Sequence, residues 1–144
     1  MILSAHFSLA EMTASQTASR LGLDNTPDAG IVNELRRLCA VLEQVRSLLG
    51  APLIINSGYR SPAVNKAVGG VGDSAHMHGR AADFICPSVG TPLELCGKIR
   101  EAGIEFDQLI HEFDSWVHLG IAAPDANPRE QVLTIDRHGT REGL

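Results

Sequence analysis

The sequence predicts an α+β fold with a single domain, because helix-like and strand-like patterns are mixed along one chain. Between residues 31 and 49, apolar residues recur at steps of three and four, as in an amphipathic helix. Two short apolar runs, 106–113 and 116–121, flank turn-forming residues, as in a β-hairpin. The length of 144 residues is that of one ordinary domain.

The composition excludes several classes of protein. Hydrophobic residues make up 44% of the chain and charged residues 20%, which is typical of a globular domain. With 17 acidic and 12 basic residues the net charge is −5, and aromatic residues are only 4%. We therefore expect no binding to nucleic acid through phosphates or stacked bases. No stretch approaches 18 apolar residues, so we also expect no insertion into a membrane.

The cysteines and the first residues indicate where the protein is made. Cys39, Cys86 and Cys96 are an odd number and show no CxxC spacing, which predicts buried thiols and disfavours a disulfide scaffold or a zinc knuckle. The first residues lack a basic segment followed by a long apolar one. We therefore expect no signal peptide and synthesis in the cytoplasm.

Local signals divide the first half of the chain. Ser8 to Glu11 fit a capping box, which predicts a short helix ending near Gly22. Turn residues at 25–28 precede the long helix at 31–49, and Gly50 is a plausible end for it. Residues 52–58 then predict a short buried strand, which a glycine-rich loop follows.

The second half has its own signals. Residues 81–86 predict a strand, and a second capping box at 91–94 opens a helix that runs to about Ala102. After the hairpin, prolines indicate a loop, and residues 131–135 predict a last edge strand.

Candidate chemistry lies in the segments 57–62, 74–83 and 116–118. His76 and Asp83 are separated by Gly79, and a glycine there lets the chain turn from a loop into a strand, so that both side chains can point at one centre. His118, on a separate strand, can supply a third ligand. Each residue alone has an ordinary structural explanation, but two imidazoles, one carboxylate and an open fourth position together are typical of a catalytic zinc site.

Three motifs in this order, SGYRSP at 57–62, SxHxxGxAxD at 74–83 and WVH at 116–118, resemble those of the D-Ala-D-Ala carboxypeptidase family of zinc peptidases. That family also includes L-Ala-D-Glu-type endopeptidases of phage lysins. Residues 7–23 and 106–110 resemble its compact branch of phages and prophages. The resemblance covers about residues 5–121 of the single domain, 1–144, and leaves 122–144 as a C-terminal extension. It implies a small α+β peptidase fold with a short antiparallel sheet and flanking helices.

The resemblance implies that His76, Asp83 and His118 bind Zn²⁺ and that Arg60 lies near the substrate. A cation beside the metal can hold a substrate carboxylate or carbonyl oxygen and stabilise an oxyanion. A structural ion pair within its loop is the alternative role for Arg60. His78 falls at a variable position of the motif and is not carried over as a ligand.

The general base is where this chain departs from the larger members of the family. They carry an acidic residue three positions before the last histidine, where this chain has Ser115, and a hydroxyl without an adjacent base accepts a proton poorly. Glu112 and Asp114 are the remaining candidates. A three-residue hairpin loop from Asp114 to Trp116 would pair Glu112 with His118, whereas a two-residue turn would pair His111 with it. We favour Glu112, because the compact branch places its glutamate in this segment, and Asp114 also fits an ordinary turn residue.

The resemblance implies zinc-assisted hydrolysis of an amide bond in the stem peptide of bacterial peptidoglycan, by an endopeptidase or a D,D-carboxypeptidase. Zn²⁺ would activate water, Glu112 would accept its proton and Arg60 would oppose the developing charge. We expect the protein to reach the cell wall by release from the cell or as part of a phage particle. One alternative is an inactive zinc-binding module of a virion, a tail or the wall, which Ser115 favours. The other is a structural domain whose histidines bind nothing.

Overall fold

One mixed sheet organises the chain, and the computed structural model describes every residue from 1 to 144. The strands lie in the order β1-β2-β4-β3-β5-β6, and all neighbours are antiparallel except β3 and β5, which are parallel. Helices and strands are mixed along the chain, which confirms the predicted α+β class. The strands are β1 (Ile54–Ser57), β2 (Ala81–Ile85), β3 (Gln108–Glu112), β4 (Trp116–Gly120), β5 (Gln131–Asp136) and β6 (Gly139–Glu142).

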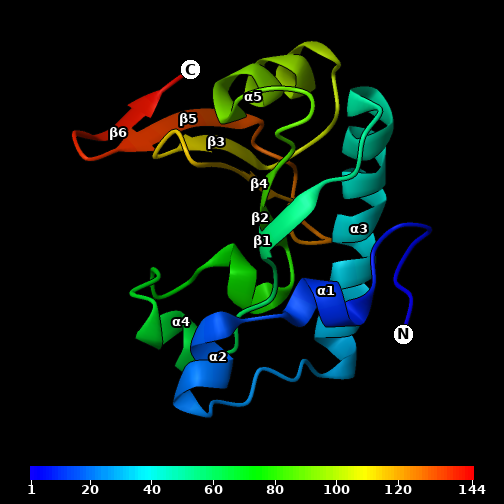
Figure 1. Cartoon of the computed structure of the whole chain (residues 1–144), viewed down its shortest axis with the longest axis vertical. Coiled ribbons are helices and arrows are strands. Elements are labelled where there is room, and N and C mark those ends of the chain that lie inside the picture. Colours follow the sequence, from blue (N-terminus) through cyan, green and yellow to red (C-terminus); the bar gives the residue numbers. More distant parts are fainter.

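The helices gather in two places around this sheet (Figure 1). The long helix α3 and the helix α5 pack against the sheet, whereas α1, α2 and α4 lie together near one end of α3. A single 3₁₀ turn, η1, precedes β2. The helical segments are α1 (Leu9–Thr13), α2 (Gln16–Leu21), α3 (Ala29–Leu49), α4 (Pro62–Ala67), η1 (Ala75–His78) and α5 (Pro92–Glu101).

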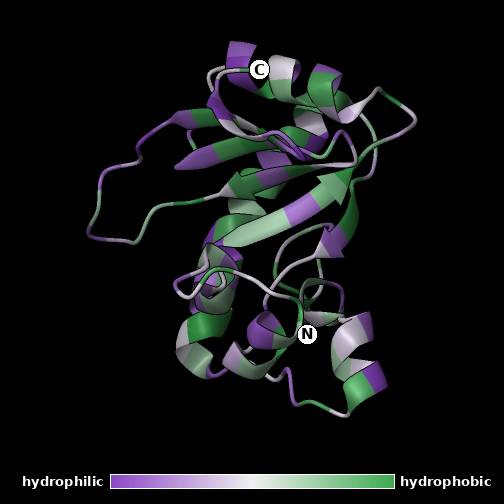
Figure 2. Ribbon diagram, turned by 90° about the vertical axis from the view of Figure 1, so that its left-hand side faces the viewer, coloured by the Kyte–Doolittle hydropathy of each residue, from purple (hydrophilic) through white to green (hydrophobic).

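The core lies between the sheet and the two longest helices. Phe84, Leu109 and Leu119 are fully buried there, against apolar side chains of α3 and α5. Full burial of one such side chain stabilises the fold by about 1.5–3 kcal/mol. Hydrophobic and hydrophilic residues alternate along the strands (Figure 2). Because successive side chains of a strand point to opposite faces, the polar residues between these core positions lie on the face away from the helices.

The N-terminal helix that the sequence predicts is broken in two. Ser8 caps α1 by accepting a hydrogen bond from the amide of Glu11, as predicted. The backbone then becomes extended at Ala14, and Ser15 caps α2 with its own side chain. Gly22 ends α2 with a φ of 66°, a left-handed conformation that glycine adopts without strain. The capping box that opens α5 is present with both of its hydrogen bonds.

Three expectations about the strands and loops were wrong. The strand β1 lies at a sheet edge with alternate residues exposed, where we expected a buried strand. The glycine-rich segment is preceded by α4, a short helix that Ser61 caps and Pro62 starts. The strand β5 is not an edge strand, because it pairs with β3 on one side and with β6 on the other. Residues 122–144 therefore contribute two strands to the sheet.

The three cysteines are free and buried, as predicted. Burial raises the pKa of the Cys39 and Cys96 thiols to about 12, which keeps them protonated at neutral pH. No helix in the structure combines the length and the apolar character that crossing a membrane requires.

Candidate metal centre and cleft

His76 lies in the 3₁₀ turn η1 and is almost completely buried, with 1% of its surface exposed. The side chain of Ser74 caps this turn by accepting a hydrogen bond from the amide of His76, at 3.2 Å. Gly79 ends the turn with a φ of 69°, and a Cβ there would lie 2.9 Å from the carbonyl oxygen of Ile31 in α3. The expectation that a glycine turns the chain at this point is confirmed, and close packing against α3 is a second reason for it.

Asp83 and His118 meet His76 on the face of the sheet opposite to α3 and α5. They are directly opposite each other on β2 and β4, so their side chains share a face. The Oδ1 atom of Asp83 lies 2.9 Å from Nδ1 of His118 and 3.3 Å from Nε2 of His76. One ligand atom from each residue lies within 4.8 Å of the other two. The structure thus brings together the three residues that the sequence nominates as ligands.

The donor set suits Zn²⁺. Nδ1 of His76 lies 2.7 Å from the carbonyl oxygen of Gly58. Because a carbonyl only accepts, the ring donates its proton there, and this leaves the lone pair of Nε2 directed at the cluster. Two imidazole nitrogens and one carboxylate oxygen are ligands that Zn²⁺ accepts, and three protein ligands leave a fourth position for water or substrate.

The charge of Asp83 fits the role of a metal ligand. Burial alone would raise the pKa of this carboxyl group, but the hydrogen bond from His118 and the interaction with His76 outweigh burial and hold the pKa well below its usual range. Asp83 is therefore ionised at neutral pH, as a carboxylate ligand must be.

Gly58 connects this cluster with the N-terminal helices. A Cβ on Gly58 would lie only 2.3 Å from the carbonyl oxygen of Met12, so no other residue fits without displacing α1. The next amide, that of Tyr59, donates a hydrogen bond to the same Met12 oxygen at 2.8 Å. The backbone after β1 thus packs directly on α1 while its Gly58 carbonyl orients His76.

Arg60 follows in the same loop and is tied to His76 through the backbone, since its amide donates to the His76 carbonyl at 3.1 Å. Burial lowers the pKa of its guanidinium, while the charges of Asp83 and Glu112 act in the opposite direction. No carboxylate hydrogen-bonds to it, and its buried Nε has no partner. A half-buried guanidinium with an unused donor beside the cluster suits a substrate oxygen better than an ion pair within its loop.

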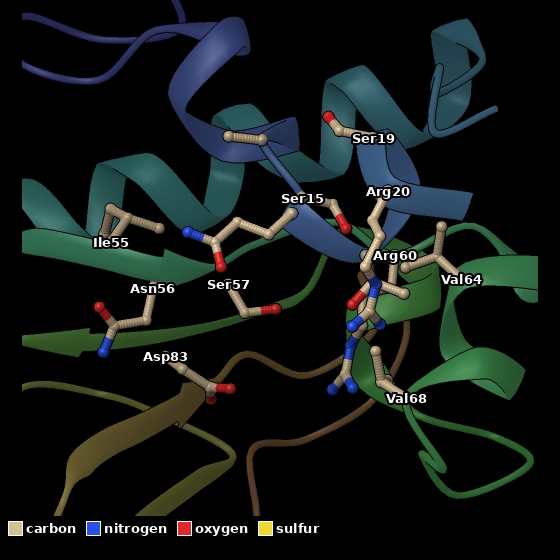
Figure 3. Close-up of a pocket in the computed structure, with 13 residues that line it drawn as sticks. Ser15, Ser19, Arg20, Ile55, Asn56, Ser57, Arg60, Val64, Val68 and Asp83 are labelled. Carbon is tan, nitrogen blue, oxygen red and sulfur yellow. The ribbon is translucent and has the colours of Figure 1, made fainter. Parts of the chain in front are cut away.

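A cleft of about 1100 Å³ opens beside Asp83 and Arg60 (Figure 3). The strand β1 forms one side of it, and the α2 region and α4 form the others. Its lining is rich in hydroxyl and amide groups, which can hydrogen-bond a peptide backbone. These groups belong to Ser15, Gln16, Thr17, Ser19, Asn56 and Ser57.

The β3–β4 hairpin places Glu112 on the face of the cluster, but not opposite His118. The loop has three residues, 113–115, and begins one residue earlier than expected, so Glu112 pairs with Trp116 and Ile110 pairs with His118. Phe113 and Asp114 both have positive φ, 52° and 49°, which lets the chain reverse there. Residues two apart share a face, so Glu112 remains on the side of His118, and it accepts a hydrogen bond from Nε1 of Trp116.

Asp114, the alternative base, lies elsewhere. Its Oδ1 is 2.9 Å from Nε2 of His111, and 76% of its side chain is exposed. His111 is directly opposite Val117, a core residue, so it occupies the other face of the sheet from His118. The geometry therefore favours Glu112 over Asp114.

The remaining motif residues have structural roles. His78 is partly exposed and paired with Asp73, away from the cluster. Tyr59 packs in the core. Sequence reasoning missed Asn25, which was assigned only to a turn. Its side chain donates to the carbonyl oxygens of Thr13 and Tyr59 and accepts from the amide of Ser61, and so ties the Arg60 loop to the N-terminal segment.

Comparison with known proteins agrees with this geometry. A sequence model of the Peptidase M15 family matches residues 5–120. Over 50 residues the chain is 42% identical to the zinc D-Ala-D-Ala carboxypeptidase of Streptomyces albus G. That match covers 34% of this chain and 20% of the relative, so it spans about a fifth of the relative's length. Because the family match extends over most of the chain and includes all three motifs, this chain belongs to the peptidase M15 family.

Proposed function

We propose that the protein is a zinc-dependent peptidase that hydrolyses an amide bond in the stem peptide of bacterial peptidoglycan. The observation that carries the proposal is the convergence of His76, Asp83 and His118 beside a polar cleft. Membership of the M15 family supports the reaction, and the name of the Streptomyces relative supports the substrate class.

The residues around the cluster can perform the proton transfers of hydrolysis. Bound Zn²⁺ supplies a Lewis acid that lowers the pKa of water and polarises a carbonyl group. Glu112 accepts the proton of the attacking water and returns it to the leaving amine, and the Trp116 hydrogen bond holds its carboxylate in place. Arg60 donates hydrogen bonds to the oxygen on which negative charge develops.

Digestion of purified peptidoglycan tests this function. The zinc-loaded protein, a chelator-treated sample and the Glu112→Gln variant are incubated with the same wall preparation, and the soluble fragments are identified by mass spectrometry. New fragments that disappear in both controls support the proposal. Intact walls from several bacterial types, together with intact synthetic stem peptides, would reject it.

The fragment masses also decide which bond is cut. Release of D-alanine alone indicates a D,D-carboxypeptidase, whereas a cut closer to the glycan strand indicates an endopeptidase. We propose further that the protein comes from a phage or prophage and reaches the wall on release from the cell or in the phage particle. Wall-degrading activity in the medium of intact, phage-free cells would contradict this route.

An inactive zinc-binding module is the second candidate. Ser115 occupies the position at which larger family members carry an acid, and its hydroxyl donates to the carbonyl of Phe113 within the hairpin loop. Stoichiometric zinc without cleavage of any substrate would favour this candidate over the peptidase.

A further inference from the structure

The cleft contains a second arginine that the proposed mechanism does not use. Arg20 lies in the last turn of α2 and lines the same cleft as Arg60 and Asp83. Figure 3 shows its side chain extending from α2 towards the part of the cleft that Arg60 occupies. Arg20 is exposed and takes part in none of the ion pairs of the structure.

The charge balance of the cleft is opposite to that of the whole chain. Although the chain carries a net charge of −5, two arginines and a single acid, Asp83, line the cleft. Asp83 is already engaged by His76 and His118. Neither guanidinium group forms an ion pair with a carboxylate, and a cleft of this kind attracts an anionic ligand.

The two arginines differ in position. Arg60 is partly buried and bonded through its backbone to the metal-ligand turn, so it lies near the reacting carbonyl. Arg20 stands on the α2 wall, and its side chain runs beside the hydroxyl group of Ser15. A guanidinium can bind a carboxylate with two parallel hydrogen bonds, and neighbouring hydroxyls can satisfy the remaining lone pairs.

We infer that Arg20 recognises a free carboxylate of the substrate, some atoms away from the bond that is cut. The inference rests on the proposed peptidase function and adds a specificity residue to it. Two groups of a stem peptide carry this chemistry, namely the C-terminal carboxylate and the α-carboxylate of its γ-linked D-glutamate.

Kinetics on three synthetic stem pentapeptides tests the inference. One peptide has both carboxylates free, one has a C-terminal amide, and one has the glutamate carboxylate amidated. For the wild type, amidation of the recognised carboxylate raises KM about tenfold or more, the size expected for one charge-assisted hydrogen bond. Arg20→Gln raises KM for the free peptide by the same factor. It causes no further rise of KM for the peptide in which the recognised carboxylate is amidated, and kcat changes less than about twofold. The peptide that loses this dependence identifies the carboxylate.

Two matched variants separate recognition from structure. Arg20→Lys keeps the charge and restores part of the lost affinity. Arg100→Gln makes the same change of charge on an exposed position of α5 that does not line the cleft, and leaves KM unaltered. The inference would be overturned if Arg20→Gln and amidation multiply each other's effect on KM for both amidated peptides. An equal rise of KM in Arg100→Gln would also overturn it.

Binding distinguishes failure of this inference from failure of the proposed function. If none of the peptides is cleaved, fluorescently labelled forms of all three are titrated with the zinc-loaded protein and followed by anisotropy. Weaker binding of Arg20→Gln to the free peptide and to one amidated peptide, but not to the other, supports carboxylate recognition although the peptidase proposal fails. Equal binding by wild type and Arg20→Gln rejects recognition by Arg20.

Discussion

The sheet contains two histidine–aspartate pairs with the same separation and different chemistry. His118 and Asp83 lie 2.9 Å apart on neighbouring strands, and His111 and Asp114 lie 2.9 Å apart within one hairpin. The first pair is buried and His76 joins it from a separate turn. The second pair lies on the other face, and its aspartate is exposed. A short His–Asp distance therefore does not define a metal site, whereas a third donor converging from another element does.

Replacing the aspartate of each pair by asparagine should give the largest difference, which is in zinc affinity. Asp83→Asn removes the only anionic ligand, so we expect zinc affinity to fall by more than about 100-fold, beyond the loss typical of residues that only support a ligand. Hydrolysis should fall with it. Asp114→Asn should retain one zinc ion per chain. Metal analysis after dialysis at equal zinc concentration checks both variants, and equal zinc in the two would contradict the assignment.

The two acids of the hairpin, Glu112 and Asp114, should differ next most in their effect on kcat. Glu112→Gln removes the proposed proton acceptor but no ligand, so zinc content should be unchanged while kcat falls about 10²–10⁴-fold. Asp114→Asn should stay within about twofold of the wild type, because Asp114 points to His111. Steady-state kinetics on a stem peptide measures both. A large loss in Asp114→Asn with an active Glu112→Gln would reverse the assignment of the base.

The depressed pKa of Asp83 makes a prediction for the metal-free protein. The unfolded value is about 3.9, and the folded value is lower, so the unfolded chain takes up the proton first as the pH falls. Ionised Asp83 thus contributes stability that is fully present above about pH 5 and is lost below about pH 4.

Urea unfolding between pH 6 and pH 3, with chelator present, measures this contribution. Relative to Asp83→Asn, the free energy of unfolding of the wild type should fall by up to about 1.4 kcal/mol per pH unit below pH 4. Parallel pH profiles of the two proteins would show that the pKa of Asp83 is not lowered by folding.

The smallest effect concerns the orientation of Glu112. Trp116→Phe keeps an aromatic ring at the hairpin but removes the indole N–H that donates to Glu112. Loss of one such hydrogen bond, about 0.5–1.5 kcal/mol, corresponds to a fall in kcat of about 2–10-fold. KM and zinc content should not change. If KM rises and kcat does not, Trp116 contacts the substrate instead of positioning Glu112.

Much of this contrast was readable from the sequence. The spacing around Gly79 predicted a turn that aims His76 and Asp83 at one centre, because only glycine adopts the required backbone without strain. The register of the hairpin was not predictable in the same way. It depends on positive φ at Phe113, a residue that seldom adopts it, and this moved the partner of Glu112 from His118 to Trp116.

Features formed by segments distant in the sequence could not be predicted from local sequence patterns either. The parallel pairing of β5 with β3 joins residues separated by a loop and by β4, and no periodicity encodes such a partner. Arg20 reads as an ordinary exposed charge on a short helix, since only the folded chain brings α2 beside β1 and Arg60. Local signals therefore located the ligands, and the tertiary fold built the cleft around them.

The peptide unit at Gly58 has a further consequence. Its carbonyl holds His76, and the amide that follows holds Met12 at the end of α1. Undocking of α1 releases the carbonyl that orients the histidine, and loss of the ion frees the histidine in turn. We therefore expect docking of residues 1–13 and binding of the metal to stabilise each other. Proteolytic removal of α1 should therefore abolish activity, and the zinc-bound protein should resist this cleavage longer than the zinc-free protein.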